Sequence, residues 1–208
     1  VVDDCFDPAS LAAIHKYFPA PEMMKPYPSH KLHRLAAQIS ANSLGSHTAS
    51  FRQPAAEFWD AFQHHLNKPA FSSQLLDATI PANLAKEKDR HPPLHLKTLL
   101  IRDIDGFSAG PHVDGPMSIF TILIYLPEHQ GLNACGTRLY VPKNPKDQDR
   151  FLRNGKSQGW ANFFEVKEIA FVSNRAFVLP RTAEAWHGVP PVKDSQGQRK
   201  SIIIHCLD

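Results

Sequence analysis

The first third of the chain carries apolar residues at helical spacing. Residues 7–18, DPASLAAIHKYF, place Leu11 and Ile14 about one turn apart, and further apolar residues follow at similar spacing. Asp7 and Pro8 form a typical helix start, because aspartate caps exposed N–H groups and proline fits the first helical position. We therefore predict a helix within residues 7–18.

Two further segments show the same pattern. In residues 53–66, QPAAEFWDAFQHHL, Pro54 precedes aromatic and apolar residues that fall on one helix face. A shorter run in residues 68–78 predicts a third helix. Residues 19–50 are rich in proline and serine and predict long loops, which often move or contribute to a site.

From about residue 94 onward, the pattern changes to short apolar runs separated by Gly, Pro, Asn and Asp. These runs predict β-strands in residues 94–104, 118–127, 137–142, 163–173, 175–180 and 199–206. The polar residues 142–162 interrupt the strands and predict an exposed insertion. Helices followed by strands indicate an α+β fold, whose strands form a sandwich or barrel of the jelly-roll type.

The length and composition fit one globular domain. With 208 residues, of which 42% are hydrophobic and 21% charged, the chain can bury a core and is not expected to be disordered. We expect a single domain, with a mainly helical supporting region in residues 1–93 and a jelly-roll core in residues 94–208. The chain begins with Val1 rather than methionine, which is compatible with an upstream domain in the native protein.

The charge and the cysteine content limit which binding partners and which cellular compartment we expect for this protein. The net charge of +3 comes without a basic block, so we expect no nucleic-acid partner. Cys5, Cys135 and Cys206 are odd in number and widely spaced, which favours a reducing, cytoplasmic compartment. The longest apolar run, Ile119–Leu126, has eight residues and cannot cross a bilayer, so we expect no membrane partner.

A histidine and an aspartate two positions apart suggest a metal site. In GPHVDG, residues 110–115, an extended chain would present His112 and Asp114 on the same side and turn Val113 away. The simpler alternative is a turn closed by an aspartate hydrogen bond, since 12 histidines will form some such pairs by chance. A metal site requires further ligands downstream.

Those further candidates occur in the last quarter of the chain. His187 follows a predicted strand in FVLPRTAEAWHGV, and two histidines with one carboxylate suit non-heme iron(II). Arg199 and Ser201 share a face of the last strand, where a guanidinium and a hydroxyl can bind a carboxylate. Taken singly, each has a simpler explanation: a buried histidine, a surface charge and an ordinary strand serine.

In combination, these segments resemble the iron(II)/2-oxoglutarate-dependent oxygenases, and above all the subgroup related to prolyl 4-hydroxylases. The matching pieces are HVD, ILIYLP, GTRLYVP, FVLPRTAEAWHGV and RKS, in that order, and the opening VVDDCFDPASLAAI is also similar. The resemblance implies a double-stranded β-helix, the cupin-like form of the jelly roll, with the N-terminal helices packed on it.

The resemblance also implies a set of metal ligands and an activity. Iron(II) would be held by His112, Asp114 and His187. With 2-oxoglutarate and dioxygen as cosubstrates, and ascorbate as an optional reductant, the enzyme would release succinate and carbon dioxide while oxidising an unactivated C–H bond. Asp114 favours hydroxylation over halogenation, because halogenating relatives lack this carboxylate; desaturation and ring closure stay open.

Cosubstrate binding would use a second group of residues. By the same resemblance, Arg199 pairs with the distal carboxylate of 2-oxoglutarate and Ser201 adds a hydrogen bond. Many relatives add a polar side chain from the core strands, and both Tyr125 and Thr121 fit that description.

Three functions remain open. The first is an oxygenase of a small molecule, whose specificity would depend on residues 19–50 and 142–162, on Arg138 and on Trp186 as a pocket wall. The second is a hydroxylase of peptide side chains. It is weakened because Cys135 stands where prolyl hydroxylases have the first glycine of a Gly-Gly-Thr segment. The third is a non-catalytic, cupin-like module that binds zinc or nickel, which would not need Arg199.

Overall fold

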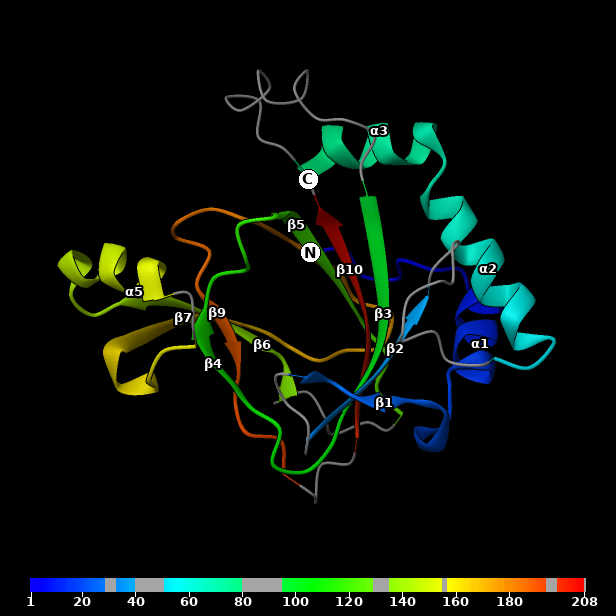
Figure 1. The fold of residues 1–208 in the computed structure, drawn as a ribbon, viewed down its shortest axis with the longest axis horizontal. Helices are drawn as coiled ribbons and strands as arrows, with labels where there is room; N and C mark the ends of the chain where they lie inside the picture. The colour runs from blue at the N-terminus through cyan, green and yellow to red at the C-terminus, as the bar shows by residue number, and fades with distance from the viewer. Residues whose placement is uncertain are drawn as a thin grey trace.

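Two antiparallel β-sheets form the centre of the structure (Figure 1). The computed structural model describes residues 1–28, 33–39, 51–79, 95–128, 135–154, 157–193 and 198–207. The larger sheet has the strand order β1-β2-β3-β10-β5-β8, and the smaller has the order β4-β9-β6-β7. The strands are β1 (Lys25–Pro26), β2 (Arg34–Ile39), β3 (His95–Asp103), β4 (Ala109–His112), β5 (Ser118–Tyr125), β6 (Thr137–Pro142), β7 (Phe163–Ile169), β8 (Ala176–Pro180), β9 (His187–Val189) and β10 (Arg199–Leu207).

Three helices from the first part of the chain accompany the larger sheet: α1 (Pro8–Tyr17), α2 (Ala55–Leu66) and α3 (Pro69–Thr79). Figure 1 shows α1 and α2 beside this sheet, on the side away from the smaller one. The predicted helices are confirmed, and the Asp7 carboxylate accepts hydrogen bonds of 3.0 Å from the N–H groups of Ala9 and Ser10. The mixed architecture of helices and antiparallel strands agrees with the α+β prediction.

The helices bury the outer face of the larger sheet. Ile14 of α1 and Trp59 of α2 belong to one core cluster with Ile202 and Ile204 of β10. The indole N–H of Trp59 donates a hydrogen bond of 2.8 Å to the carbonyl oxygen of Tyr17, so α2 is also tied to the end of α1. In the described residues, no helix has both the length and the apolar character needed to cross a membrane.

Alternate residues of β10 face in opposite directions, as the two-residue period of a strand requires. Ile202 and Ile204 pack towards the helices, whereas Ile203 packs in a second core cluster with Leu99 and Leu123. This second cluster lies between the two sheets and includes residues of β6, β7 and β8. The inner face of β10 therefore also carries Arg199, Ser201 and His205, which are the polar residues of the candidate site.

The prediction of loops throughout residues 19–50 was wrong for residues 34–39. These residues form β2, which pairs with β3 from Arg34 opposite Asp103 to Ile39 opposite Thr98. The pattern RLAAQI was missed because small alanines take the place of large apolar residues, yet Ala37 is completely buried. The short 3-10 helix Pro21–Met23 and β1 also depart from this prediction, and residues 29–32 and 40–50 lie outside the described residues.

The prediction of an exposed insertion in residues 142–162 was also incorrect in part. The segment contains α5 (Gln148–Asn154) and two short 3-10 helices, Pro145–Asp147 and Trp160–Asn162. Phe151 of α5 is buried against Trp186 and Phe163, with ring centroids 6.1 and 5.4 Å away. An aromatic side chain among polar residues thus anchors α5 to the smaller sheet.

Candidate metal centre and cavity

His112, Asp114 and His187 converge at the edge of the smaller sheet. His112 ends β4, Asp114 follows two residues later, and His187 begins β9, where it lies opposite His112 in the strand pairing. One ligand atom from each side chain lies within 4.8 Å of the others, and Nε2 of His187 is 3.7 Å from Oδ1 of Asp114. Residues 75 positions apart in the sequence are thus brought together by one pair of strands.

The backbone orients both imidazoles in the same way. Nδ1 of His112 is 2.9 Å from the carbonyl oxygen of Gly110, and Nδ1 of His187 is 3.0 Å from that of Ala185. A carbonyl oxygen can only accept, so each Nδ1 carries a proton and Nε2 is the ring nitrogen left to bind a metal. Burial, reinforced by the neighbouring His187, lowers the pKa of His112 to about 4. Its imidazole is therefore neutral at pH 7 and able to bind a metal.

The carboxylate of Asp114 is held by a neighbouring strand. The hydroxyl of Thr121 on β5 donates a hydrogen bond of 2.7 Å to Oδ2, which leaves Oδ1 directed towards His187. Burial alone would raise the pKa of Asp114, but the imidazole of His187 and the Thr121 hydrogen bond bring it below its usual value. The third candidate ligand is thus an ionised carboxylate.

The three candidate ligands open onto a cavity of about 520 Å³ between the sheets. Polar residues from other strands line the same cavity: Arg34, Thr121, Thr137, Arg199 and His205. Two imidazole nitrogens and one carboxylate oxygen on one side of a common point leave other coordination positions accessible from the cavity. This donor set fits the facial arrangement of non-heme iron(II).

Arg199 is completely buried and belongs to the wall of this cavity. Its Nη1 is 2.8 Å from Oδ2 of Asp103, and its Nε donates a hydrogen bond of 2.8 Å to the carbonyl oxygen of Cys135. The guanidinium also lies over the rings of Tyr125 and Phe171, with its central carbon 5.3 and 5.0 Å from the ring centroids. These contacts from three sides give the guanidinium one orientation.

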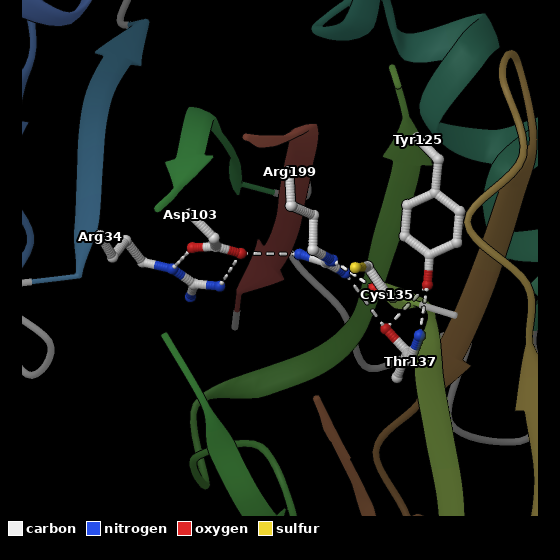
Figure 2. A network of polar contacts seen from close by, with 6 residues as sticks. All are labelled: Arg34, Asp103, Tyr125, Cys135, Thr137 and Arg199. Atoms are coloured by element: carbon white, nitrogen blue, oxygen red, sulfur yellow. Dashed lines mark hydrogen bonds and ion pairs between the residues drawn. The ribbon is translucent and has the colours of Figure 1, made fainter. Parts of the chain in front are cut away.

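A second arginine shares Asp103. Arg34 of β2 donates to both oxygens of Asp103, with distances of 2.5 and 2.9 Å. The strand register places Arg34, Asp103 and Arg199 opposite one another across β2, β3 and β10, as Figure 2 shows. Two guanidiniums and one carboxylate carry a net charge of +1, so this cluster can still bind an anion.

Tyr125 and Ser201 face each other across β5 and β10. The hydroxyl of Tyr125 donates to Oγ1 of Thr137 at 2.8 Å and accepts from the Thr137 N–H at 2.9 Å (Figure 2). Ser201 is fully buried, and its Oγ has no hydrogen-bond partner among the described residues. A buried hydroxyl without a partner costs about 1–3 kcal/mol, so a ligand oxygen would be favourable near it.

Arg138 and Trp186, predicted as substrate contacts, do not line this cavity. Arg138 lies opposite Gly188 on β9 and forms an ion pair of 2.8 Å with Glu165. Trp186 packs with Phe151 and Phe163 in the aromatic cluster under α5. Both residues are sequence neighbours of cavity residues, and neighbours on a strand point to opposite faces.

Sequence reasoning missed three polar residues of the cavity region. His205 shares the strand face of Arg199 and Ser201, so the two-residue period could have identified it. Asp103 and Arg34 become adjacent to Arg199 only through the pairing of three strands, which no local pattern reveals.

Comparisons with known proteins show which solved structures have a similar fold. No protein-family model and no curated protein matches the sequence. Among solved structures, a 2-oxoglutarate/iron(II) oxygenase-family oxidoreductase from Burkholderia pseudomallei has a TM-score of 0.58 at 15% identity, covering 100% of this chain and 83% of that one. A Pseudomonas putida prolyl 4-hydroxylase has a TM-score of 0.57 at 11% identity, covering 100% and 91%.

A third structure, HygX from Streptomyces hygroscopicus with nickel and 2-oxoglutarate bound, has a TM-score of 0.55 at 14% identity, covering 99% of this chain and 81% of that one. At these low identities, the similarity establishes a shared fold. The chain therefore has the fold of 2-oxoglutarate/iron(II) oxygenases, which agrees with the resemblance in its sequence.

Proposed function

We propose that this chain is an iron(II)- and 2-oxoglutarate-dependent dioxygenase of the prolyl-4-hydroxylase-like group, which hydroxylates an unactivated C–H bond of a small molecule. The observation that carries this proposal is the position of the three donor side chains, within 4.8 Å of one another and in the same cavity as the buried Arg199. The fold shared with such oxygenases supports it.

His112, Asp114 and His187 would hold the iron. Their free Nε2 atoms and the Asp114 carboxylate are the donor types that iron(II) accepts, and the bound nickel of HygX is consistent with a metal site in this fold. When bound, iron and 2-oxoglutarate supply the oxidising chemistry, with dioxygen consumed and succinate and carbon dioxide released. The protein keeps the His112 imidazole neutral and the Asp114 carboxylate ionised, so that both can bind the metal.

The cluster around Arg199 would bind the distal carboxylate of 2-oxoglutarate. Its net charge of +1 matches one carboxylate, and the buried hydroxyl of Ser201 lies two residues further along the same strand face. The Tyr125 and Thr137 hydroxyls border the same guanidinium. Because Arg199 already faces the cavity in one orientation, little side-chain freedom would be lost on binding.

We further infer that the chain forms one domain around a double-stranded β-helix. The strand orders β3-β10-β5-β8 and β4-β9-β6-β7 support this topology, because successive strands from β3 to β10 mostly alternate between two facing sheets. The metal residues then lie at the end of this sandwich, where the cavity opens. A volume of about 520 Å³ lies in the usual range for small-molecule sites, which supports a small substrate over a peptide.

The proposal is tested by measuring succinate formation from 2-oxoglutarate in the presence of iron(II), ascorbate and dioxygen. Asp114→Ala should abolish succinate formation, whereas the matched variant Asp149→Ala, at an exposed position on α5, should retain it. Both variants should keep the wild-type circular dichroism spectrum. Absence of succinate from the wild-type protein across broad substrate pools, or an unchanged rate for Asp114→Ala, would contradict the proposal.

A further inference from the structure

A smaller side cavity of about 290 Å³ lies next to the main cavity. Tyr27 and Leu99 line both spaces, so the two adjoin along this wall. Three further residues of its wall are polar or basic, Lys25, Gln38 and Lys97, and the other three are Pro26, Pro28 and Ala36. The proposed roles of iron and 2-oxoglutarate involve none of these residues.

Lys97 connects the side cavity with the metal centre. It shares the inner face of β3 with Leu99, and it lies opposite His205, which in turn lies opposite Thr121 on β5. The Oγ1 of Thr121 is 3.1 Å from Nδ1 of His205 and 2.7 Å from the carboxylate of Asp114. The backbones of Lys97 and Thr121 are therefore two strand spacings apart, or about 10 Å.

Positively charged side chains outnumber carboxylates in the lining of the two cavities. Among the described lining residues, the cations are Lys25, Arg34, Lys97 and Arg199, and the only carboxylate is that of Asp114. No carboxylate of the described residues lies within ion-pair distance of Lys97. Most cavity walls that bind neutral ligands contain few charges, so this excess of positive charge requires an explanation.

Iron and 2-oxoglutarate would neutralise only part of this charge. The distal carboxylate would balance the net +1 of Arg34, Asp103 and Arg199. The dipositive iron would be balanced by Asp114 and by the second carboxylate of 2-oxoglutarate. The ammonium group of Lys97, which lines the side cavity, would remain. Lys97 is only partly exposed, so its charge is less screened by water than that of the exposed Lys25.

We propose that the substrate carries an anionic group, a carboxylate or a phosphate, which Lys97 binds in the side cavity next to the metal centre. This inference rests on the proposed oxygenase function and names the class of its substrate. Lys25 adds positive charge at the mouth of the side cavity, and Gln38 offers a neutral hydrogen-bonding group. Because the strands of Lys97 and Thr121 lie two spacings apart, the substrate would have to span the wall between the two cavities to bring its oxidised carbon to the metal.

The test uses matched pairs of small compounds. Aliphatic and amino carboxylic acids are compared with their methyl esters, and phosphate monoesters with their parent alcohols, by the succinate they release above the substrate-free background. At least one acid or phosphate should stimulate release about tenfold more than its neutral counterpart, as expected for the loss of a charged hydrogen bond. Whether an acid or a phosphate stimulates release identifies the anionic group. Equal stimulation by neutral counterparts would overturn the inference.

Variants then test whether the stimulation of succinate release by anionic compounds depends on Lys97. Lys97→Gln should raise the KM for the stimulating anion about 10- to 100-fold and leave both the KM for 2-oxoglutarate and the substrate-free background unchanged. Lys167→Gln, at an exposed position on β7 outside both cavities, should change neither constant. An unchanged KM for the anion in Lys97→Gln would overturn the inference while leaving the oxygenase function intact.

Direct binding separates this inference from the proposed function. If the wild-type protein forms no succinate, the oxygenase proposal fails, and the same panel is then titrated into the metal-free protein by calorimetry. Binding of a panel anion that is lost in Lys97→Gln and retained in Arg199→Gln supports the side cavity as an anion site. If no panel anion depends on Lys97, the inference is wrong.

Discussion

The hydroxyl of Thr121 lies between two groups, the carboxylate of Asp114 and the imidazole of His205. It donates its single proton to Asp114, so the Nδ1–H of His205 must donate to the hydroxyl oxygen. A hydrogen-bonded row thus runs from β10 through β5 to the candidate metal centre. Thr121 was predicted as a candidate contact of 2-oxoglutarate, and from this hydrogen bond we propose that it also positions the Asp114 carboxylate.

Thr121→Val should therefore weaken metal binding. Loss of the hydroxyl frees the carboxylate to rotate, and loss of such supporting hydrogen bonds typically lowers metal affinity about 10- to 100-fold. The dissociation constant of nickel or cobalt can be measured by calorimetry for the wild type and for the variant. Thr121→Ser keeps the hydroxyl and should restore most of the affinity. Equal affinities for Val and Ser variants would exclude a positioning role.

Arg34 should contribute to cosubstrate binding although it is remote in sequence from the other site residues. Arg34→Gln leaves Asp103 paired with Arg199 and removes the net positive charge of the cluster. We expect the KM for 2-oxoglutarate to rise about tenfold or more, because a charged hydrogen-bonding partner is worth about 1.5–3 kcal/mol. Arg138→Gln is the matched control. Arg138 lies on the face of β6 that points away from the cavity, and this variant should keep the wild-type KM for 2-oxoglutarate.

The stability of the metal-free protein should fall between pH 6.5 and pH 4. In this range, the unfolded chain takes up a proton on His112, whereas the folded chain does not, since burial lowers the folded pKa to about 4. Stability therefore decreases as pH falls below 6.5, by up to about 3 kcal/mol for this group. Urea unfolding at pH 7 and pH 5 measures the effect. His112→Gln should show a smaller loss, and His64→Gln, exposed on α2, should match the wild type.

Trp59 should be a major source of stability for the helical layer. It is completely buried, and Trp59→Ala should lower the free energy of unfolding by about 3–5 kcal/mol through the cavity it leaves. Phe164→Ala, at a position that is 56% exposed on β7, should change the free energy by less than about 0.5 kcal/mol. Urea denaturation of both variants would test the comparison, and equal losses would contradict the assigned core.

The predictions from sequence succeeded where a signal is local. Asp7 and Pro8 mark the start of α1, and the apolar runs mark β5 and β10, because capping and strand period depend on near neighbours. The candidate metal residues were identifiable because His112 and Asp114 are two positions apart in the sequence, at and just beyond the end of β4. The structure then added the pairing of β4 with β9, which brings His187 to them.

The predictions failed where position depends on contacts between distant segments. Arg34 was placed in a loop, since nothing near it in the sequence indicates the pairing of β2 with β3. Trp186 was assigned to the pocket because it precedes His187, yet strand alternation turns it towards Phe151. No signal in the sequence marked Lys97, whose place in the side cavity depends on the pairing of β2 with β3.

The pairing of β2 with β3 also determines which fragments of the chain could fold and function on their own. A fragment of residues 94–208 would retain every candidate metal ligand and Arg199, and would match the boundary expected from the sequence. It would nevertheless lose Arg34, leave β3 as an unprotected edge strand open to aggregation, and uncover the outer face of β10. A minimal functional unit of this protein must therefore begin well before residue 34.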